Sequence, residues 1–158
     1  MTMIALKING ETVTYDVEPR TSLADFIREY HGLTGTHTAC EHGVCGACTI
    51  MLNGKPARSC ITLAAALENS DIETVEGYTQ DPVMHTLREC FKKTHAIQCG
   101  YCTPGMLATA YDIVTRLPKA GRDRIKLELS GNLCRCTGYL QIVDAIEMAR
   151  DELAVDIG

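Results

Sequence analysis

The sequence has no tryptophan, and its 158 residues include only two phenylalanines and six tyrosines. Few aromatic rings are therefore available to stack on nucleic-acid bases. The sequence also lacks a dense run of Lys or Arg, and its net charge is −5 at pH 7. Because affinity for nucleic acid comes largely from neutralising phosphates, we expect no nucleic-acid partner.

Long apolar runs are missing as well. None approaches the roughly 18 to 20 residues that a membrane-spanning helix requires. The N-terminal stretch MTMIALKINGETV becomes polar too early for a secretion signal. We therefore expect no membrane span and a cytoplasmic location. The length allows one ordinary domain or two small ones.

Cysteine, in contrast, is abundant, with nine residues in the chain. Cytosolic thiols are kept reduced, so metal binding is favoured over a disulfide framework. Eight of the cysteines fall into two sets of four. The first set is Cys40, Cys45, Cys48 and Cys60, and the second set is Cys99, Cys102, Cys134 and Cys136. The remaining Cys90 is predicted to be a small buried apolar residue.

The first set lies in a segment whose pattern predicts strands and one helix. Residues 3–17 alternate apolar and polar residues around Asn9-Gly10, which favours a β-hairpin. Ser22 can cap a helix. The buried face of that helix is predicted to contain Leu23, Phe26, Ile27 and Tyr30. The stretch TIMLNGKPA predicts a further strand and Asn-Gly turn, 62–67 a short helix, and 71–77 a last strand.

The second set lies in a segment with the helical period of 3.6 residues. Helices are predicted over 82–93, from Met106 to Leu117, and from Tyr139 to Leu153. In RIKLELS the apolar residues alternate as in a strand, but Ile125 and Leu129 would also share a helix face. A lone strand would have no partner there, so we predict a short helix. We divide the chain into residues 1–77 and residues 78–158.

The spacing of the first set is C-x4-C-x2-C with a distant fourth cysteine, which is the plant-type ferredoxin spacing for a [2Fe-2S] cluster. A two-iron, two-sulfide core is wider than one ion, so one loop supplies three thiolates and another segment closes the site. Gly43 and Gly46 fit such a loop, because glycine accepts positive φ and lets backbone N–H groups approach sulfur.

In the second set, each cysteine pair is followed by a threonine. Thr103 and Thr137 are each placed to cap a helix, and Pro104 would occupy the first helical position. Both helix N-termini would then direct N–H groups and the positive end of the helix dipole toward the thiolates. This arrangement favours an anionic metal centre.

The cysteines also allow other interpretations. Structural zinc also uses two short cysteine pairs, and the second set alone fits zinc as well as iron and sulfur. The first set favours a cluster, because three thiolates within nine residues suit a wide core. His42 could be a ligand of the Rieske type, but that would leave one cysteine of the set spare. We read it as a solvated loop residue, together with His31, His37, His85 and His95.

The segments LTGTHTACEHGVCGACTIMLNG, ARSC, IQCGYCTPGM and GNLCRCTGY together resemble the iron–sulfur subunit of the molybdenum hydroxylases, the xanthine oxidase family. The resemblance implies an α+β chain. A β-grasp, plant-type ferredoxin-like domain would hold one [2Fe-2S] cluster on Cys40, Cys45, Cys48 and Cys60. A four-helix domain would hold the other on Cys99, Cys102, Cys134 and Cys136.

The resemblance also implies partners. A large subunit would carry molybdopterin, which would contact Gln98 and Cys136, and a medium subunit would carry FAD. The expected assembly is a dimer of heterotrimers in which this chain is the separate small subunit. Electrons would pass singly from molybdenum through the second cluster and then the first to FAD, with no catalytic residue on this chain. The alternative is a zinc-binding or iron–sulfur redox-sensing adaptor. The substrate is not identified by these residues.

Overall fold

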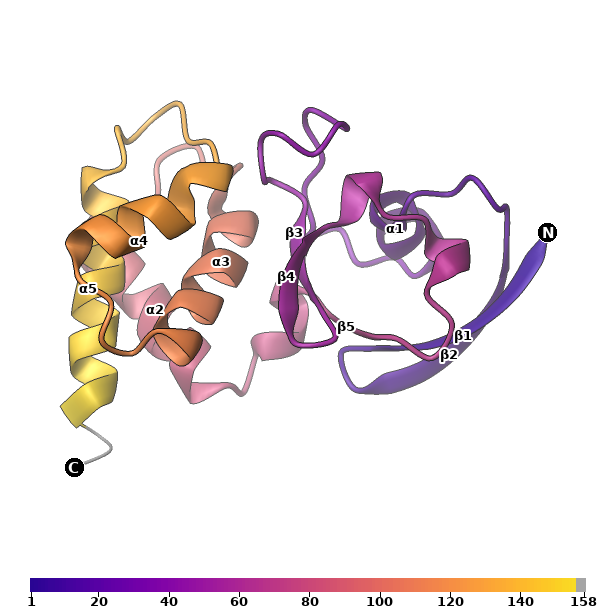
Figure 1. Ribbon diagram of the computed structural model, residues 1–158, viewed down its shortest axis with the longest axis horizontal. Coiled ribbons are helices and arrows are strands. Elements are labelled where there is room, and N and C mark those ends of the chain that lie inside the picture. The colour runs from indigo at the N-terminus through magenta and orange to yellow at the C-terminus, as the bar shows by residue number, and fades with distance from the viewer. Residues whose placement is uncertain (156–158) are drawn as a thin grey trace.

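The computed structural model describes residues 1–155 and has a mixed sheet followed by four helices (Figure 1). The strands are β1 (Thr2–Ile8), β2 (Glu11–Val17), β3 (Thr49–Leu52), β4 (Lys55–Arg58) and β5 (Asp71–Glu73). The helices are α1 (Leu23–Asp25), continued by a π-helical turn over Phe26–Tyr30, α2 (Pro82–Lys93), α3 (Thr103–Arg116), α4 (Arg122–Glu128) and α5 (Leu140–Val155). The α+β class is confirmed. Within residues 1–155, no helix combines the length and apolar character needed to cross a membrane.

Two Asn-Gly turns build the sheet. Asn9 and Gly10 have φ of +49° and +87°, and Asn53 and Gly54 have φ of +49° and +74°. Positive φ at both positions is the geometry of a tight hairpin turn. The hairpins β1–β2 and β3–β4 flank β5, which runs parallel to β1 and antiparallel to β3. The predicted hairpin over 3–17 and the predicted strand with its Asn53-Gly54 turn are confirmed.

The helix α1 covers one face of this sheet. Ser22 caps it as predicted, since its Oγ accepts a hydrogen bond from Asp25 N at 3.1 Å. Its apolar side chains are buried with those of the strands. Tyr30 was predicted on the buried face but is 40% exposed. The π-helical turn explains the difference, because its wider spacing rotates Tyr30 away from the core.

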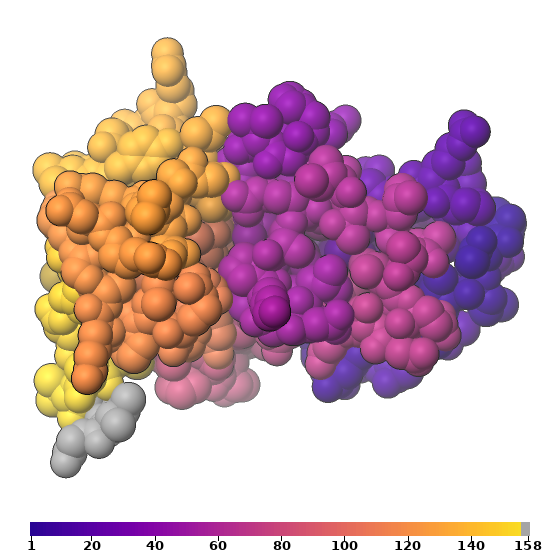
Figure 2. All heavy atoms as spheres, in the orientation of Figure 1, coloured from indigo at the N-terminus to yellow at the C-terminus, as the bar shows by residue number. Residues whose placement is uncertain are grey.

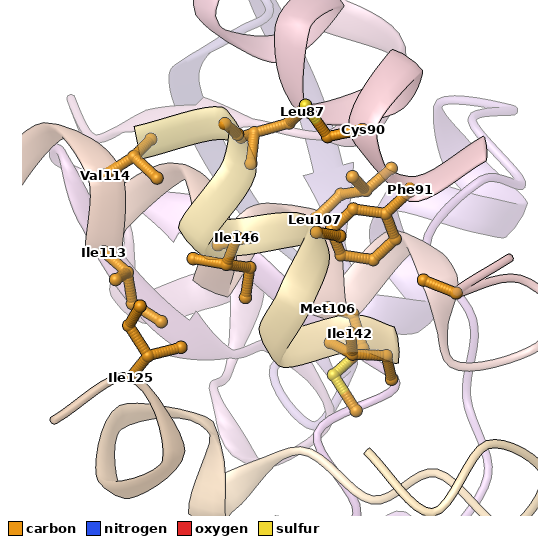
Figure 3. Close-up of a cluster of buried hydrophobic side chains, with 14 of the residues drawn as sticks. Leu87, Cys90, Phe91, Met106, Leu107, Ile113, Val114, Ile125, Ile142 and Ile146 are labelled. Carbon is orange, nitrogen blue, oxygen red and sulfur yellow. The ribbon is translucent and has the colours of Figure 1, made fainter. Parts of the chain in front are cut away.

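The helices α2 to α5 form a second core (Figure 3). The side chains labelled there come from all four helices and include the fully buried Cys90, which confirms the prediction that Cys90 is a small buried apolar residue. Ile125 and Leu129 are buried, whereas Leu127 is 62% exposed. This is the pattern of one helix face, so the predicted short helix in RIKLELS is confirmed.

Two local predictions were wrong. The strand predicted over 71–77 ends at Glu73, and a 3-10 turn follows over Val75–Tyr78. Asn9 Oδ1 accepts a hydrogen bond from Thr74 N at 2.8 Å, so the N–H of Thr74 is not available to extend the sheet. The helix predicted over 62–67 is reduced to a 3-10 turn over Ala64–Ala66. Its backbone groups pair with residues 21–23 instead.

The sheet and the helices lie against each other (Figure 2). The contact is made by β3 and β4 with α3. Met51 of β3 is buried within the core of the helices, so the two halves share packing. The predicted boundary after residue 77 falls inside the turn Val75–Tyr78. The last three residues of the predicted second domain, 156–158, lie outside the described residues.

Candidate metal centres

The first set of cysteines is collected by a glycine-bent loop. Three of the four lie between the π-helical turn and β3, and Cys60 lies in the 3-10 turn that follows β4. Gly43 and Gly46 have φ of +81° and +76°, as the sequence predicted. The bend directs backbone N–H groups toward sulfur, and Cys45 N donates to Cys40 Sγ at 3.3 Å. The loop is therefore shaped to hold an anionic group.

The pKa values of this set reflect the groups that surround each thiol. Backbone N–H groups, chiefly those of Cys45 and His42, lower the pKa of the Cys40 thiol to about 6, because they stabilise the thiolate. Burial raises the pKa of Cys60 to about 11. Its hydrogen bond to the Cys48 thiol and the charges of Cys48 and Cys40 add to that shift. The structure thus brings the four predicted residues together.

The second set lies where two chain segments enter helices, with one pair before α3 and the other before α5. The thiols of Cys102 and Cys134 are neighbours, as are those of Cys99 and Cys136. Burial, followed by the neighbouring Cys134 thiol, raises the pKa of Cys102 to about 12. Burial also acts to raise the pKa of Cys134, but hydrogen bonds, first from the Thr137 hydroxyl, outweigh it and lower that pKa. The four thiols of the second set are therefore also brought together.

The two threonines do not cap helices as predicted. α3 already includes Thr103, and Cys102 takes the cap position. α5 begins only at Leu140, because Tyr139 has a φ of +72° and interrupts the helix. The Thr137 hydroxyl instead donates to Cys134 Sγ at 3.2 Å and accepts from Tyr139 N at 3.1 Å. The Thr137 hydroxyl, which was expected to cap a helix, is therefore bonded to the sulfur of Cys134.

The two sets meet at a cavity of about 160 Å³. All four thiols of the second set line it, and so does Cys45 of the first set. Among residues 1–155, no three His, Cys, Asp or Glu side chains are arranged to hold a single metal ion. A two-iron, two-sulfide core is wider than one ion and takes four thiolates. Two convergent sets of four thiols, with N–H groups directed at sulfur, fit that donor requirement.

Other predicted residues are placed as follows. Gln98 is exposed, as are Cys99 and Cys136 beside it on the second site. His37, predicted to be a solvated loop residue, lies in a loop and is half-buried. Its ring stacks on Tyr101 with centroids 4.7 Å apart, and its Nδ1 lies 2.8 Å from Tyr101 O. This stack joins the first cysteine loop to the second.

His31 was also predicted to be solvated, and the structure places its Nδ1 3.1 Å from the Tyr15 hydroxyl. His42 is exposed and its ring contacts the Cys40 carbonyl, so it remains a loop residue. Arg58 and Asn132 were not predicted from the sequence, although their side chains connect the two cysteine loops. Arg58 precedes Cys60 by two residues and Asn132 precedes Cys134 by two, which was the only signal available.

Comparisons with known proteins agree with this geometry. The family described as 2Fe-2S iron-sulfur cluster binding domain matches residues 6–79, and the family described as [2Fe-2S] binding domain matches residues 74–147. Caffeine dehydrogenase subunit gamma of Pseudomonas sp. (strain CBB1) is 47% identical, with 92% of this chain and 89% of the relative covered. The nicotinate dehydrogenase small FeS subunit of Eubacterium barkeri is 42% identical, with 96% of both chains covered.

Among solved structures, a chain of quinoline 2-oxidoreductase from Pseudomonas putida 86 is similar throughout. It aligns with a TM-score of 0.91 at 51% identity and covers 98% of this chain and 96% of its own. Fold and cysteine geometry therefore define a protein with two [2Fe-2S] clusters, one in a ferredoxin-like domain and one in a helical domain.

The chain belongs to the family of iron–sulfur subunits of the molybdenum hydroxylases. The role of this family of subunits is electron transfer within an oxidoreductase complex. This confirms the predicted class of function, and the zinc adaptor is set aside because both halves match [2Fe-2S] domains.

Proposed function

We propose that this chain relays electrons, one at a time, from a molybdopterin centre on a larger partner to FAD on a medium partner. The observation that carries the proposal is the shared cavity, where Cys45 of the first set meets all four thiols of the second. Two neighbouring one-electron sites allow the two electrons released by an oxidation elsewhere to be passed on one at a time. When bound, each [2Fe-2S] cluster accepts and releases one electron.

The chain's own residues hold and insulate these sites. We assign the first cluster to Cys40, Cys45, Cys48 and Cys60, and the second to Cys99, Cys102, Cys134 and Cys136. The backbone N–H groups directed at Cys40 support this, since they stabilise negative charge on sulfur. Thr137 does the same for Cys134. We also propose that residues 1–77 and 78–158 act as the two cluster domains.

Partner contacts follow from exposure. Gln98 and Cys136 are exposed at the second site, which supports their assignment as the molybdopterin contact. The assembly we propose is a dimer of heterotrimers in the cytoplasm. Within residues 1–155 no two of the nine cysteines form a disulfide, which suits a reducing compartment.

The proposal is tested by isolating the complex without oxygen and analysing it by native mass spectrometry. The chain should appear with one molybdopterin chain and one flavin chain, and it should contain about four iron and about four acid-labile sulfide per copy. A chain purified alone, or one with zinc and no sulfide, contradicts the relay.

The order of transfer is tested by Cys136→Ser. Because Cys136 is assigned both to the second cluster and to the molybdopterin contact, transfer from molybdenum should be abolished. The first site should still give its electron paramagnetic resonance signal after reduction by dithionite. Loss of both signals would show that the two domains do not assemble their clusters independently.

A further inference from the structure

A single buried asparagine closes the junction between the cysteine loops. Asn132 is only 3% exposed and lies between the 3-10 turn Leu129–Gly131 and Cys134. It is one of few polar side chains buried among the described residues, and none of the ligand assignments uses it. A buried amide is costly unless its polar atoms find partners, so its contacts are informative.

The amide of Asn132 is bonded on both sides. Its Nδ2 lies 3.1 Å from both Gly46 O and Gly105 O and 3.3 Å from Thr49 Oγ1. Its Oδ1 accepts from Thr109 Oγ1 at 2.9 Å. Gly46 lies between Cys45 and Cys48, and Gly105 lies three residues after Cys102. One side chain thus links three of the cysteine-bearing segments.

Arg58 strengthens the same junction. Its guanidinium donates to Gly131 O and to Thr49 Oγ1, both at 2.5 Å, and lies 3.5 Å from Asn132 Oδ1. Thr49 Oγ1 in turn donates to Gly46 O at 2.6 Å. The network is therefore closed, and removing one member leaves buried carbonyl groups without donors.

The backbone at this junction is too close for side chains. A Cβ on Gly46 would lie 2.4 Å from Gly131 O, and a Cβ on Gly105 would lie 2.2 Å from Gly46 O. Across the gap, Leu133 N donates to Cys45 O at 2.8 Å. The loops that carry Cys45 and Cys134 are thus in direct backbone contact beside Asn132.

We propose that Asn132 is a positioning residue for electron passage between the two cluster sites. It fixes the separation and orientation of the cysteine loops and touches neither cluster itself. The inference rests on the proposed relay, because only a relay depends on that separation. Electron transfer slows as the distance between donor and acceptor grows, so a displacement of the loops would lower its rate. A junction built from fully bonded buried groups prevents such a displacement.

The test uses the full chain loaded with both clusters. Asn132→Ala removes every contact of the amide, and Asn132→Asp keeps its shape but removes its donors. Thr109→Val removes one hydrogen bond on Asn132 and should have a smaller effect. Asn9→Asp is the matched control, because Asn9 Nδ2 also bonds a threonine, Thr74 Oγ1 at 3.0 Å, but lies in the β1–β2 turn.

The main readout is the splitting that two reduced, paramagnetic clusters impose on each other's resonance signals, which depends on their separation and orientation. Both Asn132 variants should lose or narrow this splitting while keeping iron, sulfide and each single-cluster signal. The rate of electron exchange between the sites should fall several-fold. Asn9→Asp should keep the wild-type splitting and rate.

The outcomes separate the two ideas. If wild type lacks two cluster signals, the proposed relay itself fails. If loaded Asn132 variants keep the wild-type splitting and rate, the positioning role is wrong and the relay stands. If Asn132→Ala does not bind its clusters, the splitting and rate are measured in Asn132→Asp and Thr109→Val instead. Loss of both clusters in all three variants would show that Asn132 has a purely structural role.

Discussion

At the scale of single residues, Thr137 is the clearest device for adjusting a cluster site. Its hydroxyl donates to Cys134 Sγ at 3.2 Å and thereby favours negative charge on that sulfur. Thr137→Val should therefore make the second site harder to reduce. A loss of about 1 kcal/mol corresponds to a fall of roughly 40 mV for one electron. A redox titration followed by electron paramagnetic resonance measures the change.

Thr137→Ser is the control for this experiment, because it keeps the hydroxyl. It should retain the wild-type potential of the second site, and the first site should be unaffected in both variants. Equal potentials in Thr137→Val and wild type would show that the hydroxyl does not tune the cluster.

The sequence predicted residues of one kind and missed those of another. Cysteine spacing and the loop glycines were recognisable because each acts within its own short segment. Asn132 and His37 were not, because their partners are remote in the chain. Asn132 and Gly46 are 86 positions apart, and His37 and Tyr101 are 64 apart. A pattern within one short segment of sequence cannot predict contacts between residues so far apart in the chain.

At the scale of elements, α2 and α3 are joined through one carboxylate. Asp81 caps α2 by accepting from Met84 N at 2.8 Å, and it also accepts from the Tyr111 hydroxyl at 3.0 Å. Burial, then this bond, raises the pKa of Tyr111 to about 12. Tyr111→Phe should lower the free energy of unfolding by about 1.5 kcal/mol at pH 8.

The pH dependence of that loss has a definite sign. The unfolded tyrosine ionises near pH 10 and the folded one near pH 12, so wild type loses the Tyr111 contribution as pH rises through this interval. The gap between wild type and Tyr111→Phe should therefore narrow above pH 10. Urea unfolding at pH 8 and at about pH 11 measures it, and a gap that widens contradicts the assignment.

Helix boundaries show where element prediction failed. The period of 3.6 predicted α2, α3 and α5, because that period reports the buried face of the whole helix. α4 was predicted on a different ground, since a lone strand there would have had no partner. The threonine caps predicted at the cysteine pairs were wrong, since there the backbone is arranged around the thiols. Gly105 belongs to the same region. In an ordinary helix, alanine would replace glycine with a gain of about 1 kcal/mol.

Gly105→Ala should instead destabilise the chain. Its Cβ would lie 2.2 Å from Gly46 O, which is backbone and cannot move aside. The expected cost is about 1 to 3 kcal/mol in the free energy of unfolding. Gly121→Ala is the control, since a Cβ there meets nothing within 4 Å; because Gly121 is the N-cap of α4, its cost should be no more than about 1 kcal/mol. Stabilisation by Gly105→Ala would contradict the close approach.

At the scale of the whole molecule, exposed apolar side chains accompany both cysteine sets. Val44, Ile61 and Leu63 form what we call the first-site patch, and they are 57%, 61% and 50% exposed. The second-site patch consists of Ile97, Tyr101 and Leu133, at 40%, 49% and 50%. Each patch lies within three residues of a cysteine in the chain. In the proposed relay the two patches face different partners, since electrons enter at one site and leave at the other.

Equivalent substitutions in the two patches should therefore each weaken the binding of a different partner. Ile61→Asp should weaken binding of the flavin chain by about tenfold, or about 1.4 kcal/mol, and leave the molybdopterin chain bound. Ile97→Asp should do the reverse, because a buried charge is costly only in the interface that covers it. Leu127→Asp, on α4 and 62% exposed, is the matched control and should affect neither. Molybdenum and FAD that co-purify with a tagged chain measure the two losses, and release of the same partner by both variants would contradict separate docking faces.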